Sequence, residues 1–312
     1  MNTLNLKKIN EKEFIDVPNS LPEVKVNLDK AGVKNRPHYF TILDQFSKKK
    51  TRFLGNFTIL FNLPAYQRGL HMSRIERSLQ HLETTEELTL QEYGRTLVEH
   101  LLELQQQDNC VLELSVQHEF LVSKNVSGRK SHELLELFLT VEKIKNQVNY
   151  KLGIKVPFIN ACPCAQKWAK REFYTTLKSL NFKEEDIFKI IEQAPLQSHT
   201  NGGFATLIIH SQEIDYVLLY DVLNKSVPII RELLSGEDEH FVVKEAHTRA
   251  RFCEDNMRDL IKQLVKDLDG KIDDSTFIEA CVEVNESVHY HNLYAEVKDT
   301  FGNICSQFKQ GP

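Results

Sequence analysis

The stretch NCVLELSVQHEFLVSK (residues 109–124) alternates between apolar and polar side chains through its first half. The apolar set comprises Cys110, Leu112, Leu114 and Val116, and the polar set comprises Glu113, Ser115 and Gln117. Successive side chains of a strand point to opposite faces of a sheet. This period of two therefore predicts a strand that is buried on one face only.

The sequence around this strand predicts further strands and helices in the first half of the chain. Residues 1–50 are predicted to be an irregular lead-in that contains one short strand at 39–44. A longer strand is predicted at 51–64, helices at 72–83 and 88–107, and one or two strands within 133–163. The first half therefore runs strand, strand, helix, helix, strand, strand.

The second half is predicted to follow a similar order of elements. Helical segments are predicted at 167–195, at 213–236 with a break near Pro228, and at 249–270, and strands at 204–211 and 275–287. Paired antiparallel strands with two helices, occurring twice, indicate a duplicated α+β chain. We therefore predict an N-terminal module over residues 1–148 and a C-terminal module over residues 149–312. The duplication rests on element order, because the letters show no convincing repeat.

Composition limits the class of protein. A chain of 312 residues suits two domains of about 150 residues each. Its hydrophobic content of 41% and charged content of 27% are typical of a soluble globular protein. The net charge of −5 and the scattered lysines argue against nucleic acid as a partner. The N-terminus lacks the apolar core of a signal peptide, and no apolar run is long enough to cross a membrane.

The stretch NACPCAQ (residues 160–166) holds two of the six cysteines, Cys162 and Cys164, on either side of Pro163. The cysteines are spaced irregularly and do not resemble a disulfide framework, so we expect the reducing cytoplasm as the compartment. In that compartment the pair is open to three interpretations. It can be a redox pair, two structural thiols, or a thiolate that binds a borderline-soft metal such as zinc.

Four further clusters carry chemistry-bearing side chains. GLHMSR (69–74) places His71, Ser73 and Arg74 at the start of a predicted helix, where an anion can bind or where they simply cap the helix. PLQSHTNGG (195–203) places His199 in a loop before a strand. GEDEH (236–240) is predicted to be an acidic loop between helices. ESVHYH (286–291) contributes Glu286, His289 and His291 at a strand end, where a kink would bring carboxylate and imidazole together.

These clusters, in this order, resemble the type IB GTP cyclohydrolase family. The resemblance extends from LDKAGVKNRPHYFTI (28–42) through GLHMSR and NACPCAQ to FCEDNMRDL (252–260) and ESVHYHNLYAEV (286–297). It implies a tunnelling fold in which each chain carries two modules of antiparallel sheet backed by helices. It also implies a homotetramer with active sites at subunit interfaces.

The resemblance implies a reaction as well. Members of the family open the guanine ring of GTP at C8, release formate and form 7,8-dihydroneopterin triphosphate, in tetrahydrofolate and pterin biosynthesis. The implied cofactor is a divalent metal ion, namely Zn²⁺, Mn²⁺ or Fe²⁺. In this chain the family's metal ligands fall on Cys162, His199, Glu239 and His289.

Other residues take further roles under the same resemblance. Cys162, His289 and Glu286 are the expected catalytic residues, with His289 and Glu286 moving protons. Glu254 matches the carboxylate that anchors a purine or pterin ring, because a carboxylate accepts two parallel hydrogen bonds from the guanine edge. From the helix start we add His71, Ser73 and Arg74 as residues that hold the triphosphate.

The sequence departs from the family at two places. The family follows its metal histidine with Asn-Gln-Arg and a small residue, whereas this chain has Thr200-Asn201-Gly202-Gly203. The acidic loop of the family has Arg-Pro-Asp-Glu, whereas this chain has Gly236-Glu237-Asp238-Glu239 at that place. The helical insert at 167–195 resembles the archaeal branch, which forms 7,8-dihydroneopterin 2',3'-cyclic phosphate instead. A non-catalytic purine- or pterin-binding member of the fold is a further alternative.

Overall fold

The structure, a computed structural model, describes residues 16–82, 87–123, 126–231 and 235–310. The strands are β1 (Leu28–Leu43), β2 (Lys50–Leu63), β3 (Asn109–Ser123), β4 (Lys130–Ile144), β5 (Gln147–Ala161), β6 (Thr200–Ile209), β7 (Phe277–Asn285) and β8 (Asn292–Thr300). They are hydrogen-bonded in chain order, from β1 to β8, in an eight-stranded sheet. The pairs β1–β2, β2–β3, β5–β6, β6–β7 and β7–β8 are antiparallel.

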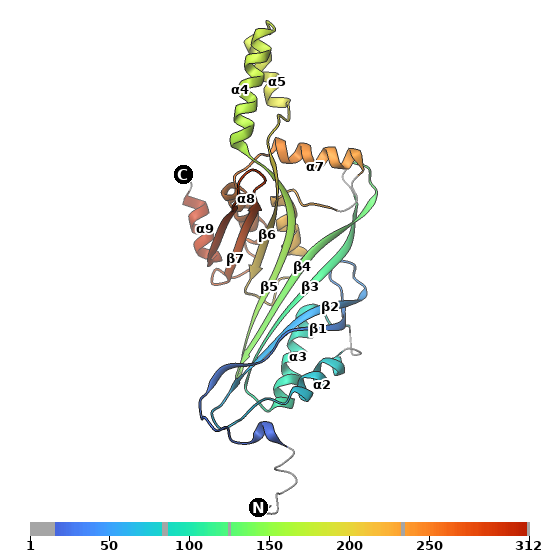
Figure 1. Ribbon diagram of the computed structural model, residues 1–312, viewed down its shortest axis with the longest axis vertical. Helices are drawn as coiled ribbons and strands as arrows, with labels where there is room; N and C mark the ends of the chain where they lie inside the picture. The colour runs from blue at the N-terminus through green and yellow to red at the C-terminus, as the bar shows by residue number, and fades with distance from the viewer. Residues whose placement is uncertain (1–15, 83–86, 124–125, 232–234, 311–312) are drawn as a thin grey trace, which may run out of the picture. The chain divides into compact units, whose positions relative to one another are not determined.

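Along the chain, the helices follow β2, β5, β6 and β8 (Figure 1). They are α2 (Met72–Leu82), α3 (Leu90–Gln105), α4 (Pro163–Ser179), α5 (Glu184–Gln193), α6 (Tyr216–Ser226), α7 (Gly236–Thr248), α8 (Cys253–Leu268) and α9 (Phe301–Gln310), with a short 3₁₀ helix η1 at Val17–Asn19. Within the described ranges, no helix combines the length and the apolar character needed to span a bilayer.

The chain divides into two compact units, in which parts of the long strands fall on either side of the division. The first unit comprises the residues up to Asp44, Lys48–Val116 and Phe138–Tyr150. The second comprises Gln45–Ser47, Gln117–Leu137 and the residues from Lys151 onward. Each unit combines antiparallel strands with helices, as the predicted α+β class requires.

In the first unit, α2 and α3 cover the strands with an apolar core. Phe40 and Phe57 pack against Tyr93 of α3, and the rings of Phe40 and Tyr93 lie 4.8 Å apart. The start of α3 is fixed by a capping box: the Thr89 hydroxyl accepts from the N–H of Glu92, and the Glu92 carboxylate accepts from the N–H of Thr89. The hydrogen bonds of this box also lower the pKa of Glu92.

The α2–α3 pair is expected to lose stability below about pH 6.5 because of His100. The ring of His100 stacks on that of His81, with centroids 4.7 Å apart. Burial, and secondly the neighbouring His81, lower the pKa of His100. The folded state then binds fewer protons than the unfolded chain, so the contribution of His100 is full above the unfolded pKa and is lost as the pH falls below it.

Urea unfolding of the wild type and of His100→Phe, at about pH 7.5 and about pH 5.5, measures this effect. Phenylalanine keeps a stacked ring but does not titrate. We expect the wild type to lose more unfolding free energy between the two pH values than the variant does. Equal losses in the two proteins would contradict the prediction.

The predicted irregular lead-in is wrong from residue 28 onward, because β1 begins there. Leu28 pairs with Leu63 of β2, and the register shifts twice before Phe40 pairs with Phe53. Most side chains in the first part of β1 are exposed. The segment therefore lacks the apolar alternation by which a strand is recognised in sequence. The part of the lead-in before residue 16 lies outside the described residues.

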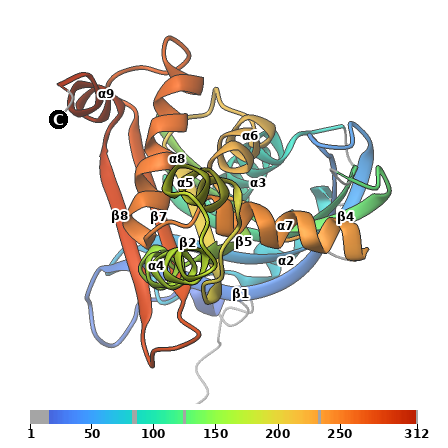
Figure 2. The ribbon, with the colours of Figure 1, turned by 90° about the horizontal axis from the view of Figure 1, so that it is seen from above.

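In the second unit, β5, β6, β7 and β8 form consecutive antiparallel pairs with regular register. Helix α8 packs on β7 and β8, and α6 contacts both α8 and β6 (Figure 2). Leu219 of α6, Leu260 of α8 and Val282 of β7 are fully buried in this core. The predicted helix at 249–270 and strand at 275–287 are confirmed with small shifts of their ends, since α8 and β7 occupy these segments.

One prediction in this unit is confirmed in part, and another is wrong. The predicted helix at 213–236 is broken near Pro228 as expected, since α6 ends at Ser226, but the next residues are extended: Ile159 donates its N–H to Pro228 O, and Ile230 donates to Pro157 O. A proline cannot donate an N–H to a continuing helix, which explains the break. The predicted acidic loop at 236–240 is the first turn of α7, where acidic side chains favourably meet the positive end of the helix dipole.

A buried charged network joins β4, α6 and the extended segment after α6. Glu133 is fully buried and accepts hydrogen bonds from the Tyr220 hydroxyl and from Arg231 Nε, each at 2.9 Å. Arg231 Nη2 also donates to Asn224 Oδ1 at 3.0 Å. Burial, and then the negative charge of Glu133, raise the pKa of Tyr220. The carboxylate therefore has a partner at both oxygens.

Gly203 of β6 is expected to tolerate no side chain, whereas Gly202 beside it is free of this constraint. A Cβ at Gly203 would lie 2.4 Å from Glu283 O and 2.8 Å from the ring of Phe158, while a Cβ at Gly202 would have no atom within 4 Å. We expect Gly203→Ala to lower the unfolding free energy by about 1–3 kcal/mol, the range for overpacking. Gly202→Ala, the matched control, should change it by less than about 0.5 kcal/mol. Urea unfolding that ranks the two variants equally would contradict this.

Candidate functional site

The CPC stretch lies at the junction between a strand and a helix. Strand β5 ends at Ala161, Cys162 is the N-cap residue of α4 in an extended conformation, and Pro163 is the first residue of the helix. Proline suits this position because the first helical N–H has no partner within the helix. The thiol of Cys162 is half-buried and that of Cys164 is exposed, so the two cysteines have different environments.

Backbone hydrogen bonds place Cys162 beside His199. The N–H of Cys162 donates to His199 O at 3.2 Å, and Cys162 O accepts from the Ser198 hydroxyl at 2.6 Å. The chain between them forms α4 and α5, two helices that contact each other (Figure 1). We call residues 163–193 the α4–α5 insert.

Gln166 fixes the base of this insert. Its side chain is buried, and its Nε2 donates to Leu196 O at 3.3 Å and to His247 O. His247 in turn contacts Ser198 O through Nε2 at 3.3 Å. The first turn of α4, the loop before His199 and the end of α7 are thereby joined, so the insert begins and ends at the same place.

His199 lies in a cluster with Asn201, Glu286 and Ser287. The Nδ1 atom of His199 is 3.2 Å from Asn201 Oδ1, 3.4 Å from Ser287 Oγ and 3.9 Å from Glu286 Oε2. Asn201 Nδ2 donates to Glu286 Oε1 at 2.8 Å, and the N–H of Ser287 donates to Asn201 Oδ1 at 3.0 Å. The strand end at Asn285 and the turn after it bring Glu286 toward His199, whereas the sequence analysis expected a kink to bring it toward His289 and His291, whose rings stack on each other instead.

The Glu286 carboxylate is shielded from solvent, and one of its oxygens has no hydrogen-bond donor among the described residues. Its side chain is only 5% exposed. Among the described residues its Oε2 is a buried oxygen without a hydrogen-bond partner. A buried carboxylate oxygen that lacks a donor is costly unless something else approaches it. This oxygen faces the His199 side of the cluster, as the 3.9 Å distance shows.

Glu239 and His289 are not gathered into this cluster. Glu239 is exposed in the first turn of α7, while its neighbour Asp238 is buried and accepts from the Ser235 hydroxyl at 2.6 Å. His289 is exposed between β7 and β8, where its ring stacks on that of His291 at 5.3 Å. In the ranges that the structure describes, no three His, Cys, Asp or Glu side chains lie close enough together to hold a metal ion.

The predicted substrate-binding residues lie at two helix starts, one in each unit. Glu254 is exposed in the first turn of α8. In the first unit, His71 directly precedes α2. Its backbone N–H donates to Gln105 Oε1, and its carbonyl oxygen accepts from Gln105 Nε2. Ser73 is exposed and Arg74 is half-buried in the first turn of α2. The predicted placement of these three residues at a helix N-terminus is thereby confirmed.

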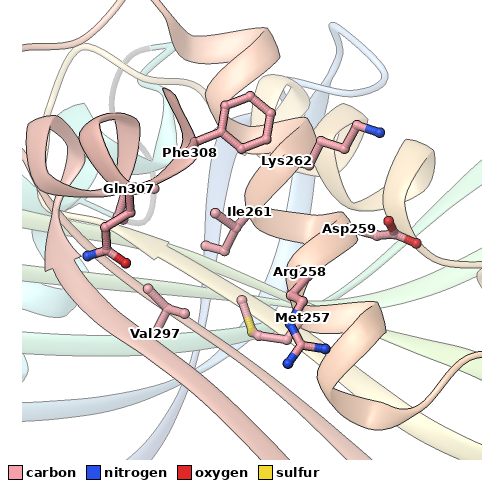
Figure 3. A pocket seen from close by; sticks show the side chains of 9 residues that line it. Met257, Arg258, Asp259, Ile261, Lys262, Val297, Gln307 and Phe308 are labelled. Carbon is pink, nitrogen blue, oxygen red and sulfur yellow. The ribbon is translucent and has the colours of Figure 1, made fainter. Parts of the chain in front are cut away.

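A cavity of ≈ 640 Å³ lies in the second unit between α8, β8 and α9 (Figure 3). Met257, Ile261, Val297 and Phe308 contribute apolar lining, while Arg258 and Lys262 lie at its α8 side. None of the residues predicted from the sequence lines it. Glu254 precedes this lining on α8 by one turn, and Met257, Arg258 and Asp259 of the lining belong to the same FCEDNMRDL stretch.

Comparison with known proteins assigns the chain to a family. A family model described as type I GTP cyclohydrolase folE2 matches residues 14–295. The chain belongs to this family. As a type I GTP cyclohydrolase it is an enzyme, and the resemblance found in the sequence is confirmed.

The relatives of this cyclohydrolase include proteins named GTP cyclohydrolase MptA. That of Methanococcus aeolicus is 29% identical over 311 residues, covering 95% of this chain and 100% of the relative. That of Methanocaldococcus jannaschii is 29% identical over 306 residues, covering 93% and 96%.

Among solved structures, the cyclohydrolase is similar to a uricase from Arthrobacter globiformis. The TM-score is 0.51 with 10% sequence identity, and the match covers 87% of this chain and 93% of the uricase. At this identity the likeness concerns the fold alone. It confirms the predicted α+β tunnelling fold.

Proposed function

We propose that this cyclohydrolase hydrolyses GTP at C8, releases formate and forms 7,8-dihydroneopterin triphosphate with the help of a bound divalent metal ion. The observation that carries the proposal is the arrangement of Cys162, His199 and Glu286 at the base of the α4–α5 insert. The nearness of a cysteine, an imidazole and a buried carboxylate supports the proposal, as does the family's description as a GTP cyclohydrolase.

The described residues support part of a metal site. Sulfur, nitrogen and oxygen donors together suit Zn²⁺, and Mn²⁺ or Fe²⁺ are alternatives. Cys162 and His199 are joined through their backbones, and the partnerless oxygen of Glu286 lies on the same side as His199. Glu239 and His289 are exposed and are the remaining proposed ligands. We expect them to complete the site where protomers of a homotetramer meet.

The residues of the chain then take distinct roles. When bound, a divalent ion supplies a water of lowered pKa for attack at C8. Glu286 and His289 accept and return protons during ring opening. Glu254 accepts the N1–H and 2-amino hydrogens of guanine, and the two parallel hydrogen bonds orient the ring. His71, Ser73 and Arg74 at the start of α2 bind the triphosphate, helped by the backbone N–H groups of that helix.

A second product is also a candidate. The curated relatives named above are MptA proteins, and the α4–α5 insert resembles the archaeal branch of the family. That branch forms 7,8-dihydroneopterin 2',3'-cyclic phosphate. Both reactions share the opening of the ring at C8 and the release of formate, so the same residues serve either one. For either reaction we expect a cytoplasmic enzyme that acts on free GTP.

Incubation of the purified protein with GTP and Zn²⁺, Mn²⁺ or Fe²⁺ tests the proposal. We expect formate, a fluorescent pterin after oxidation, and loss of both when a chelator removes the metal. Mass spectrometry of the phosphorylated product distinguishes the triphosphate from the cyclic phosphate. GTP binding without formate under every metal would favour a non-catalytic member of the fold and would refute the proposed reaction.

A further inference from the structure

Asn201 is the residue that connects the members of the His199 cluster. It lies in β6 two residues after His199, and it is only 3% exposed. Its amide oxygen faces the Ser287 N–H and His199 Nδ1, and its amide nitrogen faces Glu286. All three contacts come from one side chain, so its loss would release the three neighbours together.

The orientation of the Asn201 amide is determined by its surroundings. The Ser287 N–H can only donate, so the atom that it meets at 3.0 Å must be the amide oxygen. The amide nitrogen is then directed to Glu286 Oε1 at 2.8 Å, where a carboxylate needs a donor. The reversed amide would set donor against donor at Ser287 and acceptor against acceptor at Glu286.

This orientation determines the tautomer of His199. Asn201 Oδ1 has no hydrogen to give, so its 3.2 Å contact with His199 Nδ1 is a hydrogen bond only if His199 Nδ1 carries the proton. Glu286 Oε2, 3.9 Å from the same nitrogen, favours the same arrangement. A neutral imidazole protonated at Nδ1 keeps an unshared electron pair at Nε2. That pair is the one available to a metal ion.

We propose that Asn201 is a positioning residue of the metal site, holding His199 with Nε2 available for the metal and directing the Glu286 carboxylate. The inference rests on the proposed function, since it takes His199 as a ligand. Partners of ligating histidines fix the tautomer and ring orientation, and their loss commonly lowers metal affinity or activity by about 10–100-fold. Asparagine does so here without adding a charge beside Glu286.

Two variants separate the contacts of Asn201. Asn201→Ala removes all three. Asn201→Asp keeps oxygen acceptors for His199 and the Ser287 N–H but cannot donate to Glu286. Tyr220→Phe serves as the control, because it also removes a buried hydrogen bond in the same unit but touches neither His199 nor Glu286. Melting temperatures of all three establish that each variant folds.

The first readout is Zn²⁺ affinity of the full-length protein, measured by competition with a chromophoric chelator. The second is the separate determination of kcat and KM for GTP. We expect Asn201→Ala to lower Zn²⁺ affinity and kcat by about 10–100-fold with little change in KM. Asn201→Asp should stay within about threefold of the wild type in Zn²⁺ affinity, while its kcat falls. Tyr220→Phe should retain both values.

The outcomes distinguish the inference from the proposed function. A wild type that turns over GTP without binding a divalent metal would refute the metal-dependent function itself. A wild type that binds Zn²⁺ while Asn201→Ala binds it equally well would refute the role of Asn201 and leave the function standing. Equal losses of affinity in Asn201→Ala and Tyr220→Phe would refute it too, because the effect would then be one of general stability.

Discussion

Cys162→Ser is expected to abolish GTP turnover, whereas Cys164→Ser should leave it close to the wild-type rate. Cys162 is half-buried at the N-cap of α4 and hydrogen-bonded to the His199 backbone, while Cys164 is exposed in the first turn of α4. Serine occupies a similar volume but is a poor substitute for a thiolate as a ligand to zinc. We expect kcat/KM to fall by more than about 100-fold, beyond the loss typical of an outer partner of a ligand.

Steady-state assays of both variants, together with metal content per chain, measure this difference. Cys164→Ser is the matched control because it makes the same chemical change two residues away. A redox pair would instead require both cysteines, so equal inactivation by the two substitutions would contradict the prediction. An active Cys162→Ser that retains its metal would contradict it as well.

Arg231→Ala is expected to cause a large loss of stability in the second unit. It would leave the fully buried Glu133 carboxylate with the Tyr220 hydroxyl as its remaining partner in the network. Removing one member of a buried ion pair commonly costs about 3–5 kcal/mol, because an uncompensated charge stays in the interior. Urea unfolding followed by circular dichroism measures the change.

Lys225→Ala provides the control for this experiment. Lys225 pairs with Asp267 at a similar distance, 2.9 Å, but its side chain is 52% exposed. Exposed ion pairs contribute about 0–1 kcal/mol, so this variant should unfold close to the wild type. If Arg231→Ala and Lys225→Ala lower the unfolding free energy equally, burial does not determine the strength of the Glu133 network.

The sequence predicted those elements whose apolar pattern has a clear period. Strand β3 and helix α3 were predicted from alternation and from helical spacing, because each has one buried face. Strand β1 lacks such a face over its first half, so its pairing with β2 could not be inferred from its side chains. The end of α6 depends on Pro228, and the sequence showed the break but not the extended chain that follows it.

The candidate site was predictable only in part. The sequence singled out Cys162, His199 and Glu286 and matched them through a family resemblance, since nothing in their spacing shows that they meet. Asn201 carried no such signal, because the strand was predicted only from residue 204, whereas β6 begins at Thr200 and includes Asn201. The exposed positions of Glu239 and His289 could not be inferred, since they depend on how α7 and the turn after β7 are placed.

The closed base of the α4–α5 insert has a consequence for how this family varies in length. Cys162 and His199 are hydrogen-bonded to each other, so the helices between them only close a loop whose ends already meet. The conformational entropy lost in closing a flexible loop grows with the logarithm of its length, and doubling the loop adds only about 0.6 kcal/mol. Relatives can therefore lengthen, shorten or replace this segment at little thermodynamic cost, and the number of residues between the cysteine and the histidine carries no information about their distance in space.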